Sequence, residues 1–180
     1  GMLALLMILA VPSLAQINYS TYPYCSAPTT MSGRITYYSL TTLVNCSITT
    51  DHFDTSRYAA INEYDYQSSA GCGSCIRIWR QNGAGTPSTV QVVDQCPYVG
   101  NETWCYNNSH HIDLASSVYN TITGGLTDNP PVYWTIVECP PALRNKNNST
   151  GNIIYQWKSG SSQYWGEVVF HHFLFPIRAV

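Results

Sequence analysis

Charged residues are scarce in this chain of 180 residues: Lys, Arg, Asp and Glu make up 10% of it, against about 25% in an average soluble protein. The net charge is −2 and no polybasic stretch occurs, which excludes nucleic-acid binding driven by counterion release. Polarity comes instead from Asn, Ser, Thr and 14 Tyr, a composition typical of a secreted, sugar-facing protein. The hydrophobic share of 44% excludes general disorder.

Long apolar runs are also missing. Residues 2–15 read MLALLMILAVPSLA, which is too short to span a bilayer and ends in a small-x-small pattern. We therefore predict a signal peptide over residues 1–15, secretion, and no membrane association after cleavage. Glycosylation is predicted from Asn-x-Ser/Thr acceptors, which occur at Asn18, Asn45, Asn101, Asn107, Asn147 and Asn148.

Seven cysteines are present, and in a secreted protein they predict disulfides. Six paired cysteines allow 15 connectivities, among which spacing alone does not choose. One cysteine is left over, for which Cys25 is the candidate. A zinc site would need a second close pair beside Cys72 and Cys75, and none exists, so we expect no metal and no cofactor.

Short segments of strand character dominate the chain, and they predict an all-β barrel or sandwich. A helix is predicted over residues 113–122, where apolar residues recur every four positions before two glycines, and a shorter helix near 57–62. Residues 16–32 form a lead without periodicity, and 142–150 a polar linker. The expected strands cover residues 34–40, 75–80, 89–94 and 132–138, with a turn over 81–88 and further strand character over 151–180.

Six motifs follow one another along the chain: GRITYY (33–38), YAAIN (58–62), CGSCIRI (72–78), VQVVDQCP (90–97), HIDLA (111–115) and WTIVECP (134–140). In this order they resemble the expansin family and its double-psi β-barrel relatives, namely glycoside hydrolase family 45, barwin-like proteins and rare lipoprotein A. The tail segments 151–155 and 160–165 resemble the start of the expansin cellulose-binding domain.

The resemblance implies a six-stranded double-psi β-barrel over residues 33–141 with one or two short helices. An incomplete β-sandwich would follow over 151–180, because the sequence would stop inside a second, cellulose-binding-like domain. The resemblance also proposes three disulfides, which are Cys46–Cys72, Cys75–Cys139 and Cys96–Cys105.

Two aspartates are the candidate catalytic residues. Asp113 resembles the catalytic acid of family 45 enzymes and the aspartate of expansins; the alternative is a helix N-cap. Asp94 ends a strand, and its alternative is a turn-forming role. Hydrolysis requires a second carboxylate, yet residues 36–40, where family 45 enzymes place the base, contain none. Asp51 and Asp54 stay open as substitutes.

Sugar rings stack on aromatic side chains. The resemblance places Thr36 in the substrate groove as a hydrogen-bonding residue and Tyr164 and Trp165 on the platform of the second domain. Further candidates in the barrel are Tyr37, Tyr38, Tyr98 and Trp104.

We therefore expect a monomeric, extracellular cell-wall protein that binds β-glucan, either cellulose or hemicellulose, and loosens it without hydrolysis. The alternative is an endoglucanase similar to family 45, or a lytic transglycosylase, with Asp113 as general acid. A carboxylate facing Asp113 across the groove, about 6.5–9.5 Å away, would favour the inverting hydrolase. A barwin-like defence or lectin module is a third option, and the expansin-like tail argues against it.

Overall fold

The computed structural model describes residues 29–41, 44–144, 153–158 and 160–171. The predicted signal peptide, Cys25, and the acceptors Asn18, Asn147 and Asn148 lie outside these residues. The elements are β1 (Met31–Tyr38), β2 (Tyr58–Asn62), α1 (Glu63–Tyr66), β3 (Cys75–Arg80), β4 (Ser88–Cys96), η2 (Asn107–Ser109), β5 (Ile112–Ala115), α2 (Ser116–Thr123), β6 (Pro131–Val137), α3 (Pro141–Arg144), β7 (Ile154–Trp157) and β8 (Val168–His171).

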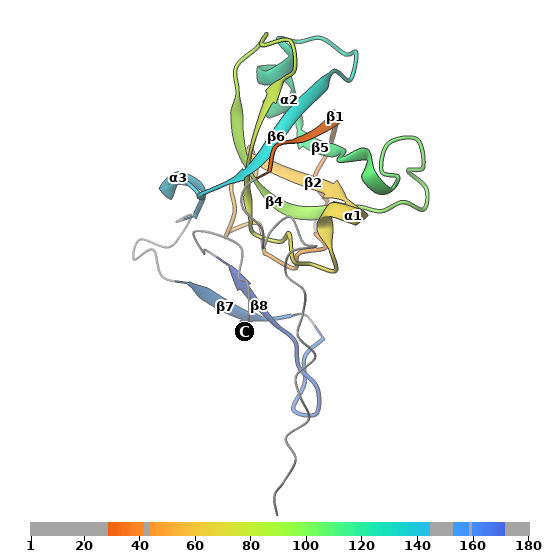
Figure 1. Ribbon diagram of the computed structural model, residues 1–180. Coiled ribbons are helices and arrows are strands. Elements are labelled where there is room, and N and C mark those ends of the chain that lie inside the picture. The colour runs from red at the N-terminus through yellow and green to blue at the C-terminus, as the bar shows by residue number, and fades with distance from the viewer. Residues whose placement is uncertain (1–28, 42–43, 145–152, 159, 172–180) are drawn as a thin grey trace, which may run out of the picture.

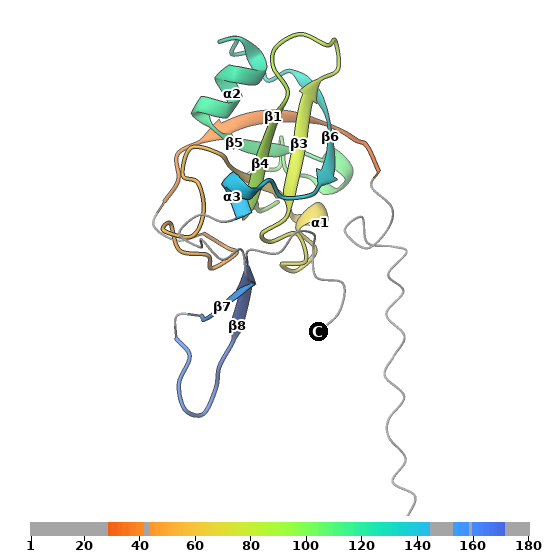
Figure 2. The same cartoon turned by 90° about the vertical axis from the view of Figure 1, so that its left-hand side faces the viewer.

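Six strands close into a barrel in the order β1-β5-β2-β4-β3-β6 (Figure 1). The pairs β1/β5 and β2/β4 are parallel, and the other four pairs are antiparallel. The helix α2 packs against β1, β3, β4 and β5 and covers one end of the barrel (Figure 2). This architecture confirms the predicted all-β, double-psi barrel with short helices.

The barrel is held together by alternating apolar side chains that fill its interior. On β3, Ile76 and Ile78 have no exposed surface, whereas Arg77 between them is exposed. On β6, Val132 and Trp134 are equally buried. Side chains of a strand alternate between its two faces, so the expected strands needed only small changes in their bounds.

Two segments differ from the predicted helices. Residues 58–62 form β2, whose side chains are all buried between β4 and β5. Residues 112–115 form β5, and α2 begins only at Ser116. In both segments tertiary pairing outweighs the helical pattern. Leu114 packs in the barrel core as a strand residue, and the buried apolar side chains of the helix are those of Val118, Tyr119 and Ile122.

Three disulfides fasten the barrel, and all were proposed from the family resemblance. They join Cys46 to Cys72, Cys75 to Cys139 and Cys96 to Cys105. The barrel also begins two residues earlier than expected, because β1 starts at Met31 and pairs there with Trp134 of β6.

The tail contains a separate two-stranded antiparallel sheet of β7 and β8. A sharp turn between them carries Gly160, whose φ of 93° lies in the left-handed region that glycine adopts without steric cost. Within the described part of the chain, no helix has both the length and the apolar character that crossing a bilayer requires.

Candidate functional site

The two candidate aspartates lie on one outward-facing row of the barrel. Asp113 of β5 pairs with Thr36 of β1 on one side and with Ala60 of β2 on the other. Ala60 in turn pairs with Asp94 of β4. Paired residues of neighbouring strands point to the same face of a sheet, so these four side chains form one face. Together with Tyr38 they are called the aspartate face below.

A β-bulge in β4 brings Asp94 onto this face. Ala59 pairs with Val92, but Ala60 pairs with Asp94, so Val93 is the extra residue. A bulge re-aims the side chains that follow it; in a regular ladder Val93 would lie opposite Ala60, and Asp94 would follow on the opposite face. Two strand spacings of about 4.8 Å separate the backbones of Asp94 and Asp113 by about 10 Å.

Asp113 belongs to a three-residue hydrogen-bonded cluster. The Thr36 hydroxyl donates to Asp113 Oδ1. His111 Nε2 lies 3.1 Å from Asp113 Oδ1 and 2.9 Å from Thr36 Oγ1. Because a carboxylate only accepts, this arrangement assigns the proton to Nε2 of His111. The histidine is 1% exposed and the Asp113 side chain 19% exposed, so the cluster is fixed from behind and reaches solvent through the carboxylate.

The N-cap interpretation of Asp113 is wrong. Ala115 is the N-cap residue of α2, and no side chain caps this helix. Asp113 lies two residues before Ala115, on β5, and its carboxylate contacts Thr36 and His111 instead of helix amides. The side chain is therefore available for chemistry on the aspartate face.

Asp94 is held by the backbone. Its Oδ1 accepts from the amides of Asn45, at 2.8 Å, and Gln95, at 2.9 Å. The Tyr38 hydroxyl lies 3.4 Å from Oδ2. Burial is the main cause that raises the pKa of Tyr38, and the carboxylates of Asp94 and Asp113 add to it. Tyr38 consequently stays a neutral hydrogen-bond donor beside the two carboxylates.

Trp104 reaches the site from a loop that extends from the barrel (Figure 1). The Cys96–Cys105 disulfide closes this loop, and the amides of Trp104 and Cys105 both bond to the Asn101 carbonyl. The indole lies against the His111 ring, with centroids 5.5 Å apart and planes 31° apart. Trp104 thus contacts the Asp113 cluster through His111.

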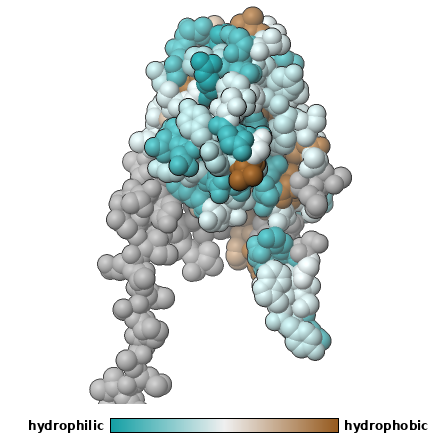
Figure 3. Space-filling view, turned by 90° about the vertical axis from the view of Figure 1, so that its right-hand side faces the viewer, coloured by the Kyte–Doolittle hydropathy of each residue, from teal (hydrophilic) through white to brown (hydrophobic). Residues whose placement is uncertain are grey.

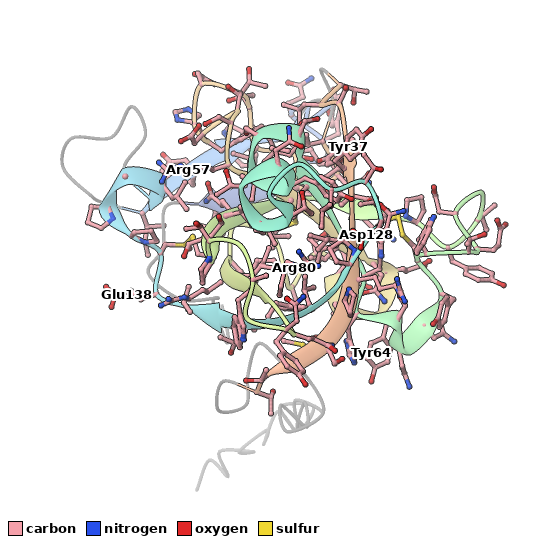
Figure 4. All side chains as sticks on the ribbon, turned by 90° about the horizontal axis from the view of Figure 1, so that it is seen from above. Tyr37, Arg57, Tyr64, Arg80, Asp128 and Glu138 are labelled. Atoms are coloured by element: carbon pink, nitrogen blue, oxygen red, sulfur yellow. A yellow bond between two sulfur atoms is a disulfide. The ribbon has the colours of Figure 1, made fainter. Side chains whose placement is uncertain are left out.

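Tyr37 and Tyr98 are not brought to this face. Tyr37 packs against Tyr119 of α2 at 5.0 Å between ring centroids and is 54% exposed there (Figure 4). Tyr98 follows β4, is exposed, and its amide lies 3.4 Å from a Glu63 carboxylate oxygen. Both aromatic rings are accessible, but they lie apart from the row that holds Asp94 and Asp113.

Tyr164 and Trp165 lie in the connection between β7 and β8, not on a strand. They are 89% and 57% exposed, so neither is a core residue. Because they do not lie on a strand, the alternation that sends neighbouring strand side chains to opposite faces does not apply to them. The Trp157 ring of β7 packs over Gly166, where an added Cβ would lie 2.9 Å from the indole.

The other acids considered as a base are committed elsewhere or lie outside the row. Asp54 accepts hydrogen bonds from Ser56 and Arg57. Burial acts to raise its pKa, but these bonds outweigh burial and lower the pKa to about 2. Asp51 is exposed and lies 3.7 Å from His52. Within the aspartate face, Asp94 is the carboxylate that accompanies Asp113.

A metal centre does not fit the Asp113 surroundings. The sulfur atoms of Cys96 and Cys105 and a carboxylate oxygen of Asp113 lie within 4.8 Å of one another. Both sulfurs are bound in a disulfide, and metal ligation requires thiolates.

Sequence reasoning missed two contributors to the site. His111 was given no role of its own, although it lies in the HIDLA motif two residues before Asp113. Ala60, whose side chain is a single methyl group, lies between the two aspartates. No signal in the sequence could have revealed it, because its place depends on the bulge at Val93.

Comparisons with known proteins concern the family and the fold. No family model matches the chain. Expansin-like protein 2 of Dictyostelium discoideum is 32% identical over 109 residues, which cover 59% of this chain and 23% of that protein. The chain therefore spans about a quarter of the length of this curated relative.

A bacterial expansin shares the fold. The expansin of Clavibacter michiganensis, a point mutant solved with cellohexaose, has a TM-score of 0.52 and 24% identity, over 79% of this chain and 63% of that one. The structure of the same expansin without ligand has a TM-score of 0.50 at the same identity and coverage. Together with the curated relative, these matches confirm the resemblance to the expansin family.

Proposed function

We propose that this chain, similar to expansins in sequence and in barrel fold, binds cell-wall β-glucan on the aspartate face and loosens it without hydrolysis. The observation that carries the proposal is the single register row of Thr36, Asp113, Ala60 and Asp94 across four adjacent strands. It supports a linear ligand lying across the strands, whose hydroxyls would meet two carboxylates borne by backbones about 10 Å apart.

The chemistry of the row suits sugar hydroxyls. The Asp113 carboxylate accepts, and the Thr36 and Tyr38 hydroxyls can exchange their present bonds for bonds to the ligand. Charge-assisted hydrogen bonds of this kind are about twice as strong as neutral ones. Competition for the hydrogen bonds between glucan chains would then weaken their adhesion without breaking a glycosidic bond.

The environment of Asp94 supports a binding role over a catalytic one. A hydrolytic base must accept a proton from water while it stays free to face the sugar ring. Asp94 instead uses one oxygen to hold two backbone amides, one of which belongs to the segment after β1. This anchoring fits a residue that shapes the face and contributes its second oxygen to ligand hydroxyls.

A hydrolase or lytic enzyme is the second candidate, and a specific observation favours it. Asp94 and Asp113 lie on the same face with only Ala60 between them. Two carboxyl groups about 6.5–9.5 Å apart serve inverting glycosidases, and side chains leaning together from backbones about 10 Å apart reach that range. In that case Asp113 would be the acid, with Thr36 and His111 holding its orientation.

The Clavibacter expansin was solved with cellohexaose, which supports a β-1,4-glucan as the ligand class. Tyr164 and Trp165 are proposed to add a stacking surface, since sugar rings pack on exposed aromatic side chains and both are accessible. The start of a cellulose-binding-like domain over residues 151–180, after a linker at 142–150, would contain them.

Secretion is part of the proposal. The apolar run of residues 2–15 would be a signal peptide ending at residue 15. The three disulfides support an oxidising compartment.

Reducing-end release from soluble and insoluble β-glucans tests the proposal, with Asp113→Asn and Asp94→Asn measured in parallel. We expect binding to cellulose without sustained release, and weaker binding for Asp113→Asn. Sustained release that either variant loses would establish the enzyme instead. Circular dichroism of each variant controls for folding, and the Asp54→Asn variant serves as a carboxylate control away from the face.

A further inference from the structure

A polar pocket lies beside the aspartate face. It has a volume of ≈ 420 Å³, within the range of about 300–1,000 Å³ for ligand pockets. Its walls come from the start of β1, from Gln81 after β3, from Pro131 of β6 and from the loop that carries Trp104. The face of the molecule that carries this loop is predominantly hydrophilic (Figure 3).

The pocket and the aspartate face share a wall. His111 lines the pocket and, through Nε2, bonds to Thr36 and Asp113. Trp104 lines the pocket and packs against the same histidine ring. A glycan bound across the aspartate face could therefore place a branch in the pocket, one side chain away from Asp113.

Donors dominate the pocket. The hydroxyls of Ser32 and Ser109 accept hydrogen bonds from Gln81 and Asn62 and keep their own protons for a ligand. Arg34 donates through Nη1 to the Asn129 carbonyl, at 2.9 Å, and a guanidinium has further N–H donors.

The charge of the pocket is positive. Arg34 forms no ion pair within the part of the chain that the structure describes, and no Asp or Glu lines the pocket. Arginine matches a carboxylate in geometry as well as in charge. Tyr106 and Trp104 supply aromatic surface to the pocket, against which a sugar ring can stack.

We propose that this pocket binds a carboxylate-bearing sugar residue carried as a side branch of the polysaccharide. Arg34 holds the carboxylate, the serine hydroxyls meet the sugar oxygens, and the aromatic wall contacts the ring. The inference deepens the proposed function and rests on it for the identity of the main chain, whereas occupation of the pocket by the free sugar acid does not depend on that function.

Amide shifts of Gly33 and Ser109 in the nitrogen-15-labelled full chain test the pocket directly. We expect saturable shifts with sodium glucuronate or galacturonate, and a dissociation constant about five- to tenfold below that for glucose or acetate alone. The two uronates distinguish the two natural sources of the acid. Equal effects of acetate and uronate, or no shift at these amides, would overturn the proposal.

Two variants separate the pocket from charge in general. Arg34→Gln should remove the preference for uronate, whereas Arg77→Gln, which removes an exposed arginine of β3 away from the pocket, should keep it. An equal loss in both variants would overturn the proposal. A chain that fails to bind cellulose but keeps the uronate shifts would refute the proposed function alone, and the reverse result would refute the pocket alone.

Discussion

Replacing Gly33 by alanine tests how the Asp113 cluster is positioned. An added Cβ at Gly33 would lie 2.0 Å from the carbonyl oxygen of His110 and 3.1 Å from that of Ser109. No positive φ is involved, so the conflict is steric. Gly33 is fixed on β1 through its pairing with Val132, and the His110 carbonyl also accepts from Trp134 Nε1 at 3.0 Å.

The clash cannot be relieved by a side chain, because the opposing atoms belong to the backbone. Contacts of real Cβ atoms do not fall below 3.0 Å, so the segment before His111 must move by about 1 Å. Overpacking costs about 1–3 kcal/mol, and loss of the Trp134 bond costs about 1 kcal/mol more. We therefore expect Gly33→Ala to lower the free energy of unfolding by about 2–4 kcal/mol.

Urea and thermal unfolding measure this loss, which should lower the melting temperature by about 10–20 °C. Cellulose binding, measured well below the transition, should weaken as well, because His111 and Asp113 follow directly after the displaced segment. Arg77→Gln, which changes an exposed side chain of β3 away from the site, is the control. A Gly33→Ala variant within about 0.5 kcal/mol of the parent, with unchanged binding, would refute the positioning argument.

Two further predictions concern pairs close to the site. His110 Nδ1 lies 2.9 Å from the buried Asp65 carboxylate, and this hydrogen bond raises the pKa of His110. The charged form of His110 therefore stabilises the fold below about pH 6.5. This stability should fall as pH rises through the raised pKa, by at most about 1.4 kcal/mol per pH unit. Burial also raises the pKa of Asp65, but the close contact with His110 keeps the ion pair. Urea unfolding across pH should therefore show the decline in stability in the parent and not in Asp65→Asn. Identical pH profiles of the two proteins would contradict the pairing. Replacing Cys96 and Cys105 by serine should cost about 2–3 kcal/mol of stability and weaken cellulose binding by releasing Trp104. Binding isotherms equal to those of the parent would show that the loop has no part in recognition.

Much of the barrel could be predicted from the sequence because its strands alternate regularly. The β3–β4 hairpin follows from the alternation around Ile76 and Ile78 and from the turn after Arg80. The disulfides came from the family resemblance, since spacing leaves 15 connectivities open. The misassigned segments are 57–62 and 113–115, where short apolar runs fit a helix and a strand equally well until the barrel pairs them.

The chemistry of the site was predicted only in part. Asp113 and Thr36 were identified from motifs, and the structure brings them into contact. The role of His111 and the place of Asp94 depend on long-range register, which no local pattern encodes. A single bulge residue, Val93, decides whether Asp94 faces the same side as Asp113, and a one-residue slip moves a side chain to the other face.

Extension of a cellulose-rich wall specimen under constant load, with reducing ends measured in the same bath, tests the central claim most directly. We predict that the protein increases extension while reducing ends stay at background, and that a folded Asp113→Asn variant loses the effect. Extension that rises in proportion to released reducing ends, or an Asp113→Asn variant as active as the parent, would contradict it.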